Sequence, residues 1–516
     1  MSIFTLLIYT WNRSGWMFPN IYSGKINSDN NENLNFLSLV GYFSAGILSL
    51  LILIPIINWP MSAIGKTLNG DAGLYHFPKA IEMLLTGSVW DFTIPYADYP
   101  FGYESLLSFT LLFTKHVPAF SFAHLFVAII TILGSWFLTR KYSRLPSGII
   151  LLGIVFLILS GFVNVPNPWY FLHHLPYTIG KNDLFLAATT ISAIVFVPFH
   201  KDENKSTNWI GLGLASGLAI SIKPNSVLIL VFLWIYALFF TNIKNTRKST
   251  IVISLIFASL GGGWIIRNLI GIKRLFLPHE IANLTIWANL NNPGFFQQIP
   301  NSFKFSLVLG LIIVILSFVK NSRISKWDVL LFVISLISFM LTPASSKSDN
   351  PAGVVWRFGL TLLFLQFVYL LAILEPAREY ILNKITRSKK ITWIISSLIV
   401  VTMSGFFILQ IDILRLMPEY ANLLERPYTD YDSEYASVSD YIDEHIHNSV
   451  VWIEGTHNFF AYDKEFTNSI TRSKQADYVV IVYESPEELW FNITLWDLVY
   501  QDSKGYIFKN PSLKSD

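Results

Sequence analysis

Eleven apolar runs without Asp, Glu, Lys or Arg divide most of this 516-residue sequence. Only 14% of its residues are charged, whereas soluble globular chains carry about 25%. A helix needs about 20 apolar residues to cross the bilayer core, and several runs approach that length. The chain is therefore predicted to be an α-helical polytopic membrane protein with about 11 transmembrane helices. The runs are 36–57, 118–139, 146–165, 184–199, 209–222, 225–240, 251–266, 305–319, 329–342, 358–374 and 391–410.

The loops between these runs predict the orientation of the chain. Loops 140–145, 200–208, 241–250, 320–328 and 375–390 are rich in Lys and Arg, and the opposite set is poor in them. Basic residues near span ends stay in the cytoplasm. We therefore expect a cytoplasmic N-terminal segment at 1–35 and a transmembrane domain at 36–410. Its outer loops are expected at 59–117 and 267–304, in a plasma (inner) membrane.

The C-terminal segment 411–516 differs in composition from the rest of the chain. It holds 19 Asp and Glu against 8 Lys and Arg. Residues 433–447 have a helical pattern, and 450–453 and 478–483 are short β-branched and aromatic stretches typical of buried strands. These features predict a small α/β extracytoplasmic domain. Its acidic charge argues against nucleic acid as a partner, because phosphate backbones attract Lys and Arg.

The positions of ionisable residues favour some functions over others. No predicted span carries one in its core, although ion-coupled transporters usually need such groups at membrane depth. The ionisable residues gather instead at the outer ends of spans, which predicts a site at the outer membrane surface. The chain has no Cys, so a disulfide framework or a thiolate site is excluded.

The first outer loop contains the most informative motif. Residues 72–85 form a plausible amphipathic helix lying on the membrane, with a kink expected at Pro78. Asp71 precedes it at an N-cap position, so its simplest role is to cap the helix. Asp98, before Tyr99 and Pro100, is also typical of a turn. The alternative is that these acids serve a reaction.

Several motifs, taken in order, resemble the GT-C superfamily of membrane glycosyltransferases, and most nearly the protein O-mannosyltransferase and lipid A aminoarabinose transferase branch. In the first loop they are an acid followed by a Tyr, an Ala, a Glu-Met, a Gly and a Trp, then a Tyr-Pro segment. The later ones are Gly213 through Gly217 to Lys223-Pro224-Asn225, then Gly263 to Asn268 with the later Pro278, then Trp356-Arg357-Phe358, and finally Ala476 to Ile481.

This resemblance implies an enzyme that takes a sugar from a polyprenyl-phosphate-linked donor on the outer face of the membrane. The sugar passes to a hydroxyl acceptor on a lipid, glycan or protein, with inversion. By match to the first-loop motif, Asp71 is the general base, which removes the acceptor proton. Tyr75, the Tyr of that motif, is expected to bind substrate.

Other candidate substrate-binding residues follow from the chemistry of the departing phosphate, which cations stabilise. Lys223, Arg267 and Arg357 lie at outer ends of spans, where the alternative for each is a side chain that snorkels beside a helix. Asp183 opens another span within Lys181-Asn182-Asp183. It is either a second acid near the site or a favourable charge at a helix N-terminus. Asp98 is expected to belong to the same site.

Two departures from the family pattern and one possible metal site qualify the resemblance. The Lys that commonly precedes a Pro-Pro-Leu segment in the aminoarabinose branch is missing before Pro100, and Ala72 stands where many mannosyltransferases have a second acid. The pair His173-His174 is a weak candidate for zinc, which wants three or four ligands. We expect no metal and no cofactor, since Lys and Arg can handle a monophosphate leaving group.

Two other functions remain compatible with the sequence. One is a flippase or other transporter of lipid-linked sugars, which the lack of a repeat and of midplane charges disfavours. The other is a non-catalytic envelope scaffold of the same fold. Asp71 discriminates between them, because only an enzyme needs its carboxylate.

Overall fold

The computed structural model describes most of the chain. The described residues are 28–62, 71–94, 96–113, 118–143, 145–160, 181–197, 206–240, 247–275, 301–318, 324–341, 359–386, 388–409, 436–454, 458–463, 465–471, 475–482 and 495–512. They form a mostly helical domain and a small C-terminal sheet, as predicted.

Each apolar run of the sequence coincides with a helix or, in one case, with a bent pair of helices. The helices are α2 Ser28–Ser62, α5 Pro118–Tyr142, α6 Ser147–Ser160, α8 Asp183–Phe196, α9 Ser206–Ile222, α10 Val227–Phe240, α11 Lys248–Leu260, α12 Gly263–Gly271, α15 Asn301–Ser317, α16 Lys326–Met340, α18 Leu360–Thr386 and α19 Lys389–Leu409.

The predicted number of about eleven spans is not confirmed. Within the described ranges, two stretches are long and apolar enough to cross a membrane by themselves, Leu34–Leu51 and Phe122–Tyr142. The pair α11 and α12, bent by 45°, would make a third. The run 251–266 was expected to be one span, but the chain bends between these helices, where Gly261 and Gly262 interrupt the helix.

Close helix packing explains two glycines of the motif at the end of α9. A Cβ at Gly213 would overlap the backbone of Ser254, and one at Gly217 would overlap the backbone of Phe257. The four-residue spacing places both on one face of α9, against α11. Small residues at this spacing let two helix backbones approach closely. The pair therefore fixes the end of α9 against α11, and Lys223 follows that end.

The turn predicted at Lys223-Pro224 is confirmed. Lys223 has an extended backbone, with φ −164° and ψ 139°, and the 3₁₀ turn η4 Pro224–Ser226 leads directly into α10. Proline restricts the residue before it to extended conformations. The turn therefore connects α9 to α10 and presents Lys223 at their shared end.

The C-terminal domain is a five-stranded sheet with α21 Ala436–His445 packed on it. The strands are β1 Val450–Glu454, β2 Ser469–Ile470, β3 Tyr478–Val482, β4 Asp497–Gln501 and β5 Gly505–Lys509. Their order is β2-β1-β3-β5-β4. The first three strands are parallel, and β5 and β4 continue the sheet antiparallel. The helix and the two strands predicted from sequence are thus confirmed.

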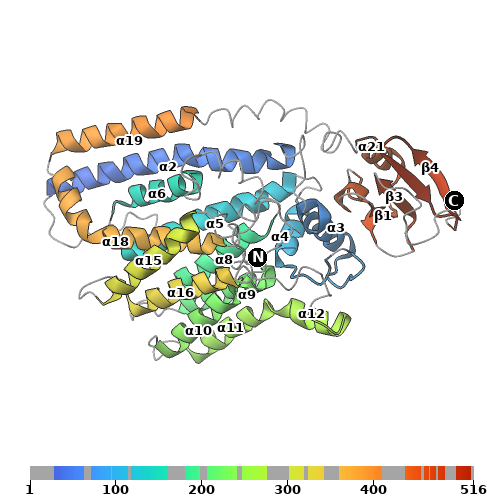
Figure 1. The fold of residues 1–516 in the computed structure, drawn as a ribbon, viewed down its shortest axis with the longest axis horizontal. Coiled ribbons are helices and arrows are strands. Elements are labelled where there is room, and N and C mark those ends of the chain that lie inside the picture. The colour runs from blue at the N-terminus through green and yellow to red at the C-terminus, as the bar shows by residue number, and fades with distance from the viewer. Residues whose placement is uncertain are drawn as a thin grey trace.

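The first loop lies between the two domains. It contains the π-helix η2 Ala72–His76, α3 Phe77–Thr86 and α4 Gly102–Leu111. In Figure 1, α3 and α4 lie between the helical bundle and the sheet, which occupies one end of the elongated molecule. The short 3₁₀ helix η8 Asn458–Ala461 of the C-terminal domain packs on η2. The loop is therefore in contact with both domains.

Candidate active site

Asp71 stands at the start of the first-loop helix and does not cap it. Its backbone is already helical, with φ −65° and ψ −37°, and its side chain accepts no capping hydrogen bond. Its carboxylate instead lies 3.2 Å from Lys181 Nζ, with 35% of the Asp71 side chain exposed. A capping residue normally has non-helical backbone angles. Helix capping, the simplest role considered for Asp71, therefore does not explain its position.

Asp183 and Lys223 form a second ion pair beside the first. Lys223 Nζ lies 2.7 Å from Asp183 Oδ1 and also donates to Asn182 Oδ1 at 3.4 Å. The Asn182 amide in turn donates to the carbonyl of Ile222 at 3.4 Å. Asp183 occupies the first turn of α8, where the helix dipole favours a negative charge. These contacts hold the start of α8 against the end of α9.

The tripeptide Lys181-Asn182-Asp183 joins the two ion pairs. Lys181 contacts Asp71 on one side, and Asp183 contacts Lys223 on the other. The structure thus brings three predicted site residues, Asp71, Asp183 and Lys223, to one place. Lys181 was not among the predicted site residues. Its position next to Asp183 was the available signal, but its partner lies 110 positions earlier in the chain.

Tyr75 belongs to an aromatic cluster one helical turn beyond Asp71. Its ring centroid lies 4.7 Å from that of Tyr96 and 5.7 Å from that of Tyr99, and it packs on His76 at 4.1 Å. Aromatic pairs at these separations add to the stability gained by burial. The cluster forms an aromatic wall beside the helix that carries Asp71.

Arg267 is buried and holds the backbone of the first loop. Its guanidinium donates to the carbonyls of Val89, Ala97 and Tyr99 and to Asn268 Oδ1. It also lies 5.0 Å from the ring of Phe92 and 5.0 Å from that of Phe101. This arrangement differs from the snorkelling side chain considered above. The donors of Arg267 are directed at the loop, so its direct effect is to position the loop.

Asp98 lies in the Arg267 group and not in the two ion pairs. It is fully buried, and its carbonyl accepts the side-chain amide of Asn268. Arg267 binds the carbonyls on either side of it, those of Ala97 and Tyr99. The structure therefore places Asp98 in a tightly held turn. Arg357 and the pair His173-His174 lie outside the described residues.

A buried ionic cluster beneath η2 was not predicted from the sequence. His76 Nδ1 lies 2.7 Å from Glu104 Oε1, and Lys79 Nζ lies 3.5 Å from the same oxygen. Lys79 also donates to the carbonyl of Pro100 at 3.3 Å. Burial raises the pKa of Glu104, but the nearby Lys79 and His76 outweigh burial, so the pKa is lowered. The cluster ties η2 and α3 to α4.

Glu82 connects α3 to the C-terminal domain. Its Oε1 accepts hydrogen bonds from the Tyr462 hydroxyl at 2.8 Å and from the Ile470 backbone N–H at 2.7 Å. Burial raises the pKa of Glu82 to about 7, although both hydrogen bonds act in the opposite direction. The charge of Asp91 adds to the increase. Glu82 therefore changes its charge near neutral pH.

Replacing Glu82 by Gln is expected to remove one source of pH dependence from the stability. The native pKa lies above the unfolded value, so the native state holds an extra proton between about pH 4.5 and 7. Stability therefore falls as pH rises through that window, by at most about 3 kcal/mol. Gln mimics the neutral acid. Thermal unfolding at pH 5 and pH 8 should show a smaller pH difference for Glu82→Gln than for wild type. An equal difference in both proteins would contradict this assignment.

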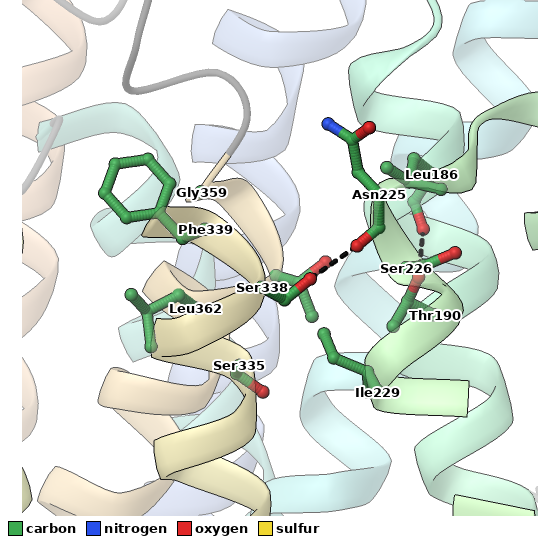
Figure 2. Close-up of a pocket in the computed structure, with 11 residues that line it drawn as sticks. Leu186, Thr190, Asn225, Ser226, Ile229, Ser335, Ser338, Phe339, Gly359 and Leu362 are labelled. Carbon is green, nitrogen blue, oxygen red and sulfur yellow. Dashed lines mark hydrogen bonds between the residues drawn. The ribbon is translucent and has the colours of Figure 1, made fainter. Parts of the chain in front are cut away.

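A small cavity lies among α8, α10, α16 and α18, just beyond the Lys223 turn. Figure 2 shows that its lining includes several hydroxyl side chains. Thr190 and Ser338 donate to the carbonyls of Leu186 and Asn225, whereas Ser226 Oγ is buried without a hydrogen bond among the described residues. The cavity is therefore mildly polar and carries no charged side chain. In this respect the cavity differs from the charged site formed by the two ion pairs.

No metal site is evident in the described part of the chain. Among those residues, no group of three or more His, Cys, Asp or Glu is arranged to hold a metal ion. The carboxylates of the site are instead paired with Lys. Among the described residues, the charged groups that these two ion pairs bring together are Lys181, Lys223, Asp71 and Asp183.

Comparisons with known proteins agree with the fold expected from the motifs. No protein-family model matches the sequence, and no curated protein matches it significantly. The structure is similar to that of ArnT from Cupriavidus metallidurans bound to undecaprenyl phosphate, with a TM-score of 0.50 and 14% identity over 91% of this chain and 99% of that one. The apo structure of the same enzyme gives a TM-score of 0.49, with 15% identity over 90% and 97%. The first of these similarities confirms the fold that the motif resemblance predicted.

Proposed function

We propose that this chain, which has the GT-C fold, is an integral membrane glycosyltransferase that uses a polyprenyl-phosphate-linked sugar. The observation that carries this proposal is the arrangement around Asp71. A partly exposed carboxylate and two Lys side chains lie together at the ends of apolar helices. A base for an acceptor hydroxyl and cations for a departing phosphate are the groups that such a transfer needs.

In the proposed reaction, Asp71 is the general base. Its carboxylate takes the proton of the acceptor hydroxyl as that oxygen attacks the anomeric carbon of the sugar. The bond from this carbon to the phosphate oxygen breaks, and polyprenyl phosphate leaves with the electron pair. Attack from the face opposite the phosphate inverts the configuration of the sugar. The acceptor is a lipid, a glycan or a protein.

Lys181 and Lys223 are proposed to stabilise the charge that develops on the phosphate. Both side chains are partly exposed, at 15% and 22%, although each is paired with a carboxylate. A cation that is already oriented by a carboxylate needs little reorganisation when charge develops. Undecaprenyl phosphate is bound in the ArnT structure that this fold resembles, which supports a polyprenyl carrier. Arg357, predicted to contact phosphate as well, stays a candidate.

The proposed site belongs at the outer membrane surface, following the predicted orientation. In that arrangement the N-terminal segment 1–35 is cytoplasmic, the domain 36–410 spans the membrane, and 411–516 is extracytoplasmic. Lys and Arg in the alternate loops support this orientation. The lipid-linked donor would then reach Lys223 from the bilayer and the acceptor would approach Asp71 from the aqueous side.

A donor panel tests the proposal directly. The purified protein is incubated in detergent with labelled polyprenyl-phosphate sugars, and release or transfer of sugar is followed. We expect one donor to be consumed, with polyprenyl phosphate as the second product. Consumption of none of the donors, together with sugar-lipid translocation in reconstituted vesicles, would instead support a flippase. Binding without turnover or translocation would support a non-catalytic scaffold.

A further inference from the structure

The helix that begins at Asp71 contains an unusual turn. Ala72–His76 is a π-helix, closed by a hydrogen bond from the Phe77 N–H to the Ala72 carbonyl five residues before it. In an α-helix the carbonyl of Leu74 would accept the N–H of residue 78. That residue is Pro78, which has no N–H. Where a kink was expected at Pro78, the chain forms this π-turn, and Pro78 leaves the Leu74 carbonyl without its α-helical donor.

Asn458 of the C-terminal domain supplies a donor in its place. Its side-chain amide donates to the Leu74 carbonyl at 2.6 Å, across 384 positions of sequence. Asn458 is buried, with 4% of its surface exposed, and it begins η8. A buried amide donor directed at a carbonyl is a specific contact, because either group left alone would cost desolvation free energy. The C-terminal domain thus contacts the π-turn itself.

A second set of contacts fixes the same helix two turns further on. Glu82 accepts from Tyr462 and Ile470. Between the two points, Phe77 stacks on Phe120 at 4.1 Å and meets Phe459 edge-on at 5.9 Å. Contacts at both ends of a helical segment restrain its rotation as well as its translation. The C-terminal domain therefore holds the segment from Leu74 to Glu82 in one orientation.

The π-turn makes this orientation important for Asp71. A π-turn holds about one residue more than an α-turn, and each residue turns a helix by about 100°. If the turn relaxed to an α-turn, the residues before it would rotate by roughly that angle relative to α3. The carboxylate of Asp71 would then leave Lys181, which lies 3.2 Å away in the observed arrangement.

We propose that the C-terminal domain positions the catalytic carboxylate, and that Asn458 is the positioning residue through its hydrogen bond to the Leu74 carbonyl. This inference rests on the proposed function for its catalytic consequence. It gives the C-terminal domain a part in the reaction, although Asn458 itself touches neither substrate nor base. The domain acts by keeping the helix of Asp71 in the register that faces Lys181.

Two substitutions at Asn458 test the inference through kinetics. Asn458→Ala removes the amide, and Asn458→Asp keeps its shape but offers no N–H. Both are expected to lower kcat by about 10- to 100-fold, as small misplacements of reacting groups do, with the KM for the lipid donor nearly unchanged. Asn510→Ala is the matched control. Its amide also donates to a backbone carbonyl, that of Ala476 at 3.1 Å, but within the C-terminal domain.

The kinetic outcomes separate positioning from general destabilisation. Loss of kcat in both Asn458 variants, with wild-type turnover in Asn510→Ala, supports the inference. Equal kcat values in all three variants would overturn it. A parallel rise in donor KM without loss of kcat would overturn it as well, because a displaced base affects the chemical step.

Hydrogen exchange gives a second test that needs no activity. The amides of residues 72–77 are expected to exchange at least tenfold faster in Asn458→Ala than in wild type, while those of α8 and of the Asn510→Ala control stay unchanged. Unchanged exchange at 72–77 would overturn the positioning role. If exchange increases but no donor is turned over by wild type, the positioning of the Asp71 helix stands and the proposed function fails.

Discussion

Asp71→Asn is expected to reduce sugar transfer by about 10²- to 10⁴-fold, the usual contribution of a general base. Asn keeps the size of the side chain but cannot accept a proton at neutral pH. The helix should survive, because the Asp71 side chain makes no capping hydrogen bond. Its ion pair with Lys181 is partly exposed, and such pairs contribute little to stability. The expected result is therefore a folded and inactive protein.

The measurement is turnover of the accepted polyprenyl-phosphate sugar, with thermal unfolding of each variant in the same detergent. Asp91→Asn is a suitable control in the same loop. The Asp91 carboxylate accepts hydrogen bonds from Thr93 within an exposed turn, and Asn can still accept one. Wild-type turnover by a folded Asp71→Asn protein would remove Asp71 from the reaction. A scaffold or a flippase would then be the better description of the chain.

Arg267→Lys is expected to destabilise the protein by about 3 kcal/mol or more and to abolish transfer as a consequence. The Arg267 guanidinium reaches the carbonyls of Val89, Ala97 and Tyr99 at once, between the rings of Phe92 and Phe101. A Lys ammonium is a point charge without the planar fork of donors. Several buried carbonyls would therefore lose their donor, and the loop that surrounds Tyr75 would no longer be held.

Thermal unfolding and donor kinetics together separate this structural effect from a contact with phosphate. Arg274→Lys is the control, because Arg274 is exposed a few residues further along the same segment. A large drop in Tm for Arg267→Lys alone supports the positioning of the loop. An unchanged Tm with a raised KM for the donor would show that Arg267 binds the phosphate, the role predicted for it from the chemistry of the departing phosphate.

The positions of the helices could be predicted from sequence because helix formation in apolar runs depends on neighbours along the chain. The run 209–222 became α9, and the run after Pro224 became α10. The Lys223-Pro224 turn followed from the restrictions that proline places on its own backbone and on the residue before it. The strands at 450–453 and 478–483 were recognisable by their β-branched residues.

The lengths of the spans and the bends within them were harder to predict from the sequence. Composition gave eleven apolar runs but not where each helix stops, so the count of spans is not confirmed by the described helices. The bend between α11 and α12 falls inside a continuous apolar run. A hydropathy profile does not detect this bend, because glycine disrupts a helix through backbone freedom and not through polarity.

The sequence by itself was enough to predict a mostly helical chain of membrane-protein composition, the order of its helices and the strands of the C-terminal domain. It also singled out Asp71 as the candidate base. Only the tertiary structure decided that Lys181 faces Asp71, that Arg267 holds the first loop, and that Asn458 and Glu82 join the C-terminal domain to the helix of Asp71. The physical reason is the range of the interactions. Periodicity and turn chemistry act over a few residues, whereas ion pairs and buried hydrogen bonds join residues up to 388 positions apart, which only packing can bring together.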